Sequence, residues 1–97
     1  MRVESLRWDD ANIEHIANHS VSPDEVEDVC FGLHLVRKER PLVYIMSGQT
    51  SAGRYINVVV EHVGKGQFRP ITAFEMSENY KKSYRARMKK KAIKVRR

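Results

Sequence analysis

The order of apolar and polar residues predicts two short helices at the start of the chain. After Asp9, the apolar residues Ile13, Ile16 and Ala17 follow the i, i+3, i+4 spacing that places side chains on one face of a helix. The link over residues 19–21 is short, so a second helix is expected to run back against the first.

The second helix has clear start and stop signals. Residues 22–25 read Ser-Pro-Asp-Glu, which places a capping hydroxyl, a proline at the first helical position and a glutamate three residues after the cap. Gly32 marks its end. Its apolar stripe consists of Val26, Val29, Cys30 and Leu33. On this stripe Cys30 is expected to be a small buried hydrophobe rather than a nucleophile.

From residue 34 the apolar period changes to two, which is typical of β-strands. Turn-forming residues divide this part of the chain into four segments. The predicted strands are residues 34–39, 42–48, 54–63 and 68–74. Because their connections are short, neighbouring strands are expected to be antiparallel.

Beyond Ser77 the helical spacing returns. Tyr80, Tyr84, Met88 and Ala92 recur every fourth residue with lysine and arginine between them, which predicts a basic amphipathic helix from about residue 78 to the low nineties. The expected fold is α+β in the order ααββββα: two N-terminal helices, a four-stranded, mainly antiparallel sheet and a C-terminal basic helix. Residues 1–97 form a single domain in this interpretation, with residues 86–97 as a basic helical or disordered tail.

Composition places the chain among globular proteins. Its 97 residues, 41% of them hydrophobic, suffice for one core. No apolar run approaches the roughly 18–20 residues that span a bilayer, and the first residues do not read as a secretory signal, so a cytoplasmic protein is expected. The single cysteine excludes an internal disulfide framework and a multi-cysteine zinc site.

Charge is divided unevenly along the chain. Residues 81–97 hold ten basic residues and no acidic one, whereas the first thirty residues hold two arginines and eight carboxylates. A polyanion such as RNA or DNA suits the basic end. A solubilising tail is the alternative, and a membrane-surface anchor is less favoured because the helix lacks bulky apolar residues. The cations expected to contact nucleic acid are Arg37, Arg40, Lys81, Lys82, Arg85, Arg87, Lys89 and Lys90.

Two short patterns suggest cofactor or metal chemistry, but both are incomplete. His15 and His19 have a spacing that can chelate a metal, yet no third ligand is placed to complete a site. Residues 48–53 are similar to a phosphate loop, but they lack its Lys-Ser/Thr pair and lie between two strands, as a hairpin loop would. We therefore expect no cofactor and no metal.

Another set of residues could cleave RNA without a metal. Such cleavage needs a base for the 2′-hydroxyl, cations for the scissile phosphate and an acid for the leaving oxygen. His62 or Glu75 could serve as the base, Arg54 and Arg69 as phosphate clamps, and a tyrosine or lysine as the acid. The alternative is structural, because arginines at strand ends commonly pair with carboxylates on neighbouring elements.

Three segments carry a family resemblance. They are residues 8–26 (WDDANIEHIANHSVSPDEV), 48–60 (GQTSAGRYINVVV) and 69–84 (RPITAFEMSENYKKSY). In this order and with these gaps, the chain resembles the BrnT-like toxins over roughly residues 6–84. These are ribonucleases of the RelE-type fold from type II toxin–antitoxin modules. The resemblance implies a surface that faces RNA, free or on the ribosome, and a cognate DNA-binding antitoxin that covers the toxin.

The same resemblance implies roles for individual residues. Arg54 matches the basic position at the start of the central strand, Arg69 matches the residue before the Pro-Ile-Thr-Ala segment, and Tyr84 matches the late helix tyrosine. Family members commonly carry arginine where this chain has Phe74, and loss of one such charge stabiliser costs ~10²–10³ in rate. Two hypotheses follow: a toxin that cleaves RNA by 2′-hydroxyl attack, and a non-catalytic nucleic-acid-binding module with the same fold.

Overall fold

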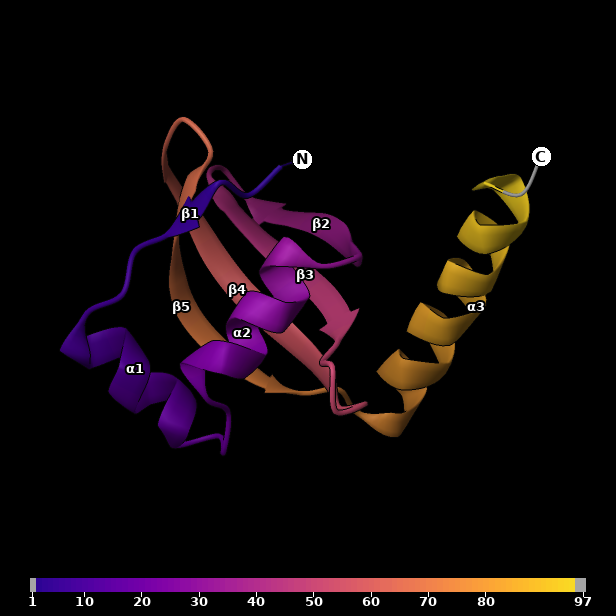
Figure 1. Cartoon of the computed structure of the whole chain (residues 1–97), viewed down its shortest axis with the longest axis horizontal. Helices are drawn as coiled ribbons and strands as arrows, with labels where there is room; N and C mark the ends of the chain where they lie inside the picture. Colours follow the sequence, from indigo (N-terminus) through magenta and orange to yellow (C-terminus); the bar gives the residue numbers. More distant parts are fainter. Residues whose placement is uncertain (1, 96–97) are drawn as a thin grey trace.

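The computed structural model describes the backbone of residues 2–95 and the side chains as far as residue 91. It is an α+β fold with a twisted sheet (Figure 1). Helices α1 and α2 lie against one face of the sheet, and the long helix α3 contacts the other face near one end of the strands. In chain order the elements are β1 (Ser5–Leu6), α1 (Asp10–Ala17), α2 (Pro23–Phe31), β2 (His34–Arg40), β3 (Val43–Gln49), β4 (Tyr55–Gly64), β5 (Gln67–Glu75) and α3 (Glu78–Val95).

The sheet has five strands in the order β1-β5-β4-β3-β2. The four strands predicted from the sequence pair as neighbouring antiparallel strands, whereas β1 pairs parallel with β5. The expected four-stranded sheet is therefore corrected to a mixed sheet of five. A two-residue strand has no period of its own. Backbone amides of Glu4 and Ser5 bind the carbonyl of Gly66, a turn residue with φ 66°.

Helix α1 begins where the sequence predicts, but the face that it buries differs from the predicted apolar stripe. The Asn12 amide donates to the Asp9 carboxylate over 2.8 Å, and the Asp9 amide donates to the Asn12 side chain over 2.9 Å. Asn12 and Ile16 are buried, whereas Ile13 and Ala17 are exposed, so the predicted stripe is wrong at two of its three positions. The reciprocal cap needs Asn12 to face the protein.

The second helix follows its predicted start closely. Ser22 and Glu25 form the reciprocal capping box, and Pro23 opens the helix. Val26, Val29 and Cys30 are buried as expected. Leu33 is 66% exposed, which corrects its place on the stripe: the helix ends at Phe31, and Leu33 lies beyond its last turn.

The core lies between the sheet and the pair α1 and α2. Met46, Val58 and Ala73 are aligned across three neighbouring strands and are fully buried. Gly48 allows close approach, because a Cβ there would lie 3.0 Å from a methyl carbon of Val29 on α2. Burial raises the pKa of the Cys30 thiol to about 12, so this cysteine is an inert core residue.

The opposite face of the sheet meets α3. Because Gly48 faces α2, the alternation of a strand turns its neighbour Ser47 to the other side. Tyr80 of α3 contacts Ser47 there, with 3.1 Å between their oxygens. The helix is formed as far as Val95, so residues 86–95 of the expected basic tail are helical, while residues 96 and 97 lie outside the described range. Among the described residues, no helix is long and apolar enough to cross a membrane.

Candidate nucleic-acid interface

Helix α3 is anchored to the sheet by tyrosines. Tyr84 is 6% exposed, and its ring centre lies 5.9 Å from that of Tyr55 in an edge-on arrangement. Burial, with a smaller contribution from Tyr55, raises the pKa of the Tyr84 phenol. The Lys81 ammonium lies 5.1 Å from the centre of the Tyr55 ring, and the Arg85 guanidinium lies 5.9 Å from it. Aromatic packing and cation–π contacts thus hold the first turns of a strongly basic helix.

A chain of polar groups orients the helix against the sheet. The Ser47 hydroxyl donates to the Asn57 side-chain oxygen over 2.6 Å, and both residues are buried. A serine hydroxyl has one hydrogen, so the Tyr80 phenol is the donor in its 3.1 Å contact with Ser47. This relay places Tyr80 at a defined point above β3 and β4.

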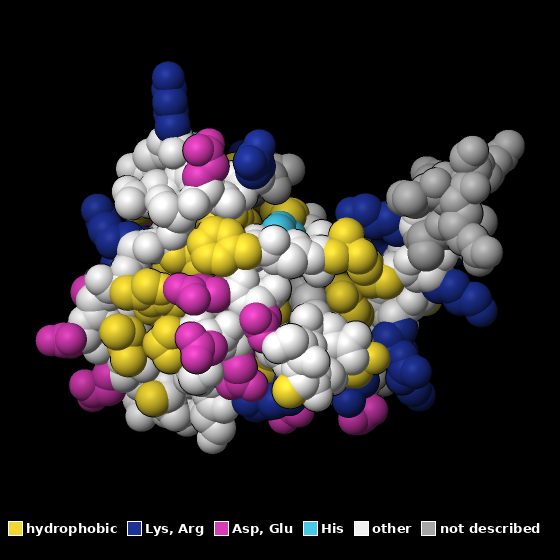
Figure 2. All heavy atoms as spheres, in the orientation of Figure 1, with side chains coloured by type: hydrophobic (Ala, Val, Ile, Leu, Met, Phe, Trp, Pro, Cys, Tyr) yellow, Lys and Arg dark blue, Asp and Glu magenta, His cyan; other side chains and the backbone are white. Residues whose placement is uncertain are grey.

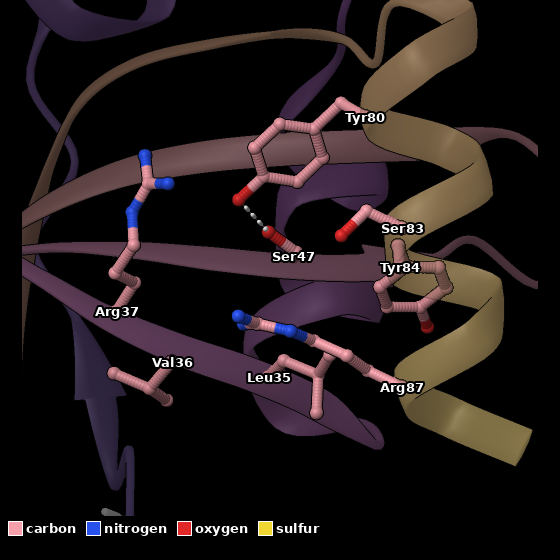
Figure 3. A pocket seen from close by; sticks show the side chains of 8 residues that line it. All are labelled: Leu35, Val36, Arg37, Ser47, Tyr80, Ser83, Tyr84 and Arg87. Carbon is pink, nitrogen blue, oxygen red and sulfur yellow. Dashed lines mark hydrogen bonds between the residues drawn. The ribbon is translucent and has the colours of Figure 1, made fainter. Parts of the chain in front are cut away.

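A pocket of about 150 Å³ opens between this relay and the second strand. Figure 3 shows Arg37 rising from β2 beside the Tyr80 ring and Arg87 reaching from α3 toward the strands. The lining consists of Leu35, Val36, Arg37, Ser47, Tyr80, Ser83, Tyr84 and Arg87. It contains two guanidinium groups, several hydroxyls and no carboxylate, which is a donor set suited to an anion.

Arg37 forms two contacts at the edge of this pocket. Its guanidinium carbon lies 5.7 Å from the centre of the Tyr80 ring. One terminal nitrogen donates to the Glu39 carboxylate over 2.9 Å in an exposed ion pair. Since a guanidinium has five N–H donors, Arg37 retains hydrogen-bonding capacity toward the pocket.

The remaining cations expected to contact nucleic acid are exposed, with one exception. In Figure 2 carboxylates gather over the α1–α2 side of the molecule, while lysine and arginine side chains gather along α3. Lys81 is the exception, because it is half-buried and pairs with Glu78 over 3.4 Å. Arg40 is exposed and is the last residue of β2. The exposed cations of α3 are Lys82, Arg85, Arg87, Lys89 and Lys90.

Arg54, a predicted phosphate clamp, joins the link between α1 and α2 to the β3–β4 hairpin. Its Nη1 atom donates to the Glu25 carboxylate over 2.9 Å and to the Ser20 carbonyl over 2.8 Å. Ser20 has a φ of 60°, and this bond holds its carbonyl in the turn. The geometry gives Arg54 a structural contact in place of a free guanidinium.

Arg69, the other predicted clamp, is also paired. Its Nε atom donates to the Asp9 carboxylate over 3.1 Å. The pKa of Asp9 is lowered, first by the hydrogen bond from the Asn12 amide and further by Arg69. Arg69 therefore joins β5 to the cap of α1.

The five residues expected to catalyse cleavage lie in two groups. Arg54, Glu75 and Tyr84 are near the start of β4, where Glu75 is exposed and pairs in register with Ile56. His62 and Arg69 lie toward the β4–β5 turn, and the His62 ring is 4.9 Å from that of Phe68. The separation along β4 is ~20 Å for six residues of strand. One phosphate does not contact both groups at once.

Sequence reasoning missed the polar relay under α3. Ser47 and Asn57 were absent from the expected site, although each is a polar residue within an apolar strand segment. That pattern is the signal that could have found them, because buried polar residues need partners. His15 and His19 have ring centres 5.9 Å apart, and the described residues contain no cluster of three metal-ligating side chains.

Comparison with protein-family models, with curated proteins and with solved structures found no match.

Proposed function

We propose that the protein binds RNA along α3 and the adjoining edge of the sheet, as the toxin of a type II toxin–antitoxin module. The observation that carries this proposal is the helix segment from Lys81 to Lys91, which contains seven cations and no carboxylate and is held to the sheet by Tyr80 and Tyr84. Its antitoxin would be a DNA-binding protein that covers this surface.

The helix presents its charge in a form suited to a phosphate backbone. Eleven residues of helix extend about 16 Å, so several phosphates of one strand fall within reach of the lysine and arginine side chains. Each phosphate contact releases counterions, and four contacts on single-stranded RNA give a logarithmic salt slope of about −3. The exposed guanidinium groups of Arg85 and Arg87 also suit stacking with unpaired bases.

Fluorescence anisotropy with a labelled single-stranded RNA tests this proposal. The triple variant Lys82→Glu, Lys89→Glu, Lys90→Glu is expected to lose at least ~10-fold in affinity and to show a shallower salt slope. Lys65→Glu, in the exposed turn between β4 and β5, is the control for a change in charge away from α3. Equal losses in both proteins would refute an interface on the helix.

A second candidate function is cleavage of RNA at the 2′-hydroxyl. It is favoured by the exposed carboxylate of Glu75, which lies beside the start of β4, where Lys81 and Arg85 contact Tyr55. Glu75 would take the 2′-hydroxyl proton, the cations would stabilise the charge on the phosphate, and Lys81 would protonate the 5′-oxygen that leaves as the P–O5′ bond breaks. Arg54 and Arg69 are each paired with a carboxylate, so the candidate does not depend on them as phosphate clamps.

The cleavage candidate is tested by growth after induced expression and by mapping of RNA ends. Wild type is expected to arrest growth and to leave 2′,3′-cyclic phosphate ends, and Glu75→Gln is expected to lose ~10²-fold or more in cleavage. Arrest and cleavage by Glu75→Gln at the wild-type rate would remove Glu75 from the mechanism. Intact RNA with wild type, together with tight binding, would leave the binding function alone.

A further inference from the structure

The pocket beneath Tyr80 differs from the rest of the basic surface because it is a hollow with a buried floor. Ser47 at its floor is 3% exposed, and the strands β2 and β3 form one wall while α3 forms the other. The exposed lysines of α3 offer charge to any polyanion, whereas this pocket offers hydrogen-bond donors from several directions to a single group.

We propose that this pocket binds a phosphomonoester, the terminal phosphate of an RNA chain. That the phosphate belongs to an RNA end rests on the proposed function, whereas affinity of the pocket for phosphate itself does not. In this site Arg37, Arg87 and the nearby hydroxyls bind one phosphate group together. General contact with the RNA backbone does not require such a cluster.

The donors match a phosphate group in number and kind. Among the described residues Arg87 has no hydrogen-bond or ion-pair partner, so its full planar fork faces the pocket. Arg37 uses one terminal nitrogen for Glu39, which leaves its Nε and Nη1 donors. Ser83 adds a hydroxyl from the helix. Charge-assisted bonds from arginine forks are the strongest that proteins offer to phosphate.

The volume of the pocket matches an end group of an RNA chain. A cavity of 150 Å³ holds a molecule about the size of benzene, and the pocket measures about 150 Å³. One phosphate group fits this space, while the attached nucleoside remains outside it.

Charge favours a terminal phosphate over an internal one. A phosphomonoester carries nearly two negative charges at neutral pH because its second pKa is about 6, whereas a phosphodiester carries one. Arg37 and Arg87 together supply two positive charges, and the Glu39 carboxylate opposes part of the first. A dianion therefore gains more from the two guanidinium groups than a monoanion does, and it competes better with Glu39 for Arg37.

The test compares one short RNA with three kinds of end. Its affinity is measured by competition as a 5′-phosphate, as a 3′-phosphate and with hydroxyls at both ends. Wild type is expected to prefer one phosphorylated form by ~10-fold or more, and the preferred form identifies the end. Equal affinity for all three would overturn the proposal.

Two variants separate the pocket from the helix. Arg87→Gln is expected to bind phosphorylated and hydroxyl-ended RNA equally, whereas Arg85→Gln, which loses the same charge two residues away, keeps the preference. Glu39→Gln is expected to strengthen binding of the phosphorylated end severalfold, because it removes the competing carboxylate. Circular dichroism verifies that each variant is folded, and loss of the preference in Arg85→Gln as well would refute a specific pocket.

Inorganic phosphate distinguishes failure of this proposal from failure of RNA binding. Titration of wild type, followed by ¹⁵N NMR of the arginine Nε signals, is expected to give saturable shifts at Arg37 and Arg87 even if RNA does not bind. Such shifts without RNA binding would refute the proposed function and retain the phosphate site. No saturable shift, or the same affinity in Arg87→Gln, would refute the site whatever RNA does.

Discussion

The two sides of the sheet use the same residue type for different purposes. On the side of α1 and α2, Arg54 and Arg69 are each bound to a carboxylate and join elements of the fold. On the side of α3, Arg85 lies over an aromatic ring and Arg87 faces a pocket without a lining carboxylate. Arg54 and Arg69 join distant elements through their carboxylates, whereas Arg37 pairs with Glu39 of its own strand and keeps further donors for a ligand.

The two sides also differ in what they bury. Between the sheet and the two N-terminal helices the buried residues are mainly aliphatic. Under α3 the sheet buries the hydrogen-bonded pair Ser47 and Asn57, and the contact is made by tyrosines. Stability is therefore expected to depend mostly on the first side, and ligand specificity on the second.

The largest expected effect comes from opening the apolar side. Phe68→Ala removes a ring that is 2% exposed and contacts the rings of Tyr44 and His62. The loss of burial and the resulting cavity are expected to lower the free energy of unfolding by about 3–5 kcal/mol, measured by urea denaturation. A loss below about 1 kcal/mol would contradict the assignment of the main core to this side.

The helices and four of the strands are predictable because local signals set their limits. Both capping boxes and the change of period at residue 34 are visible without any tertiary information. β1 escapes prediction because two residues form it, and its partner Gln67–Phe68 lies about sixty residues away. This parallel pairing forms only once folding brings residues 5–6 beside the β4–β5 turn, so no local pattern predicts it.

The candidate site is predictable only in its residue types. The basic last helix and its tyrosines are evident in the sequence, and so is Arg37, the cation of β2 that lies beside Tyr80. The roles of Arg54 and Arg69 are not, because their partners Glu25 and Asp9 are 29 and 60 residues distant. Long-range ion pairs separate structural cations from free ones, and sequence spacing does not reveal them.

Arg54→Met tests the structural role of the first arginine. It leaves Glu25 and the Ser20 carbonyl without their donor, at a site that is partly exposed. The expected loss in the free energy of unfolding is about 1 kcal/mol, with RNA affinity unchanged within twofold. Arg85→Met is the matched comparison, since it should lower RNA affinity and leave stability nearly intact. A loss of RNA affinity in Arg54→Met together with a loss of stability in Arg85→Met would contradict the roles assigned to the two sides of the sheet.

Thr72→Val addresses a polar group on the second side that has no partner. Thr72 is paired in register with Val59, and its hydroxyl is the buried side-chain polar atom without a hydrogen bond among the described residues. Replacing it with a methyl group of the same shape is expected to raise the free energy of unfolding by up to ~1 kcal/mol.

Thr50→Val is the control for Thr72→Val, because the Thr50 hydroxyl accepts a bond from the Arg54 amide over 3.0 Å. That variant is expected to be destabilised. If both threonine variants lose stability in urea denaturation, the hydroxyl of Thr72 has a partner in solution.

The smallest effect concerns the phenol that anchors α3. The pKa of Tyr84 is raised by burial, so the unfolded chain loses this proton first as pH rises. The contribution of the neutral phenol is complete below the unfolded pKa of about 10 and declines as pH rises through the higher folded value. Urea denaturation at pH 8 and at pH 11 is expected to show a larger loss of stability in wild type than in Tyr84→Phe, which has no proton to lose. Equal losses in the two proteins would mean that Tyr84 has the same pKa in the folded and unfolded chain. The contact between α3 and the sheet would then be open to water, unlike the core on the side of α1 and α2.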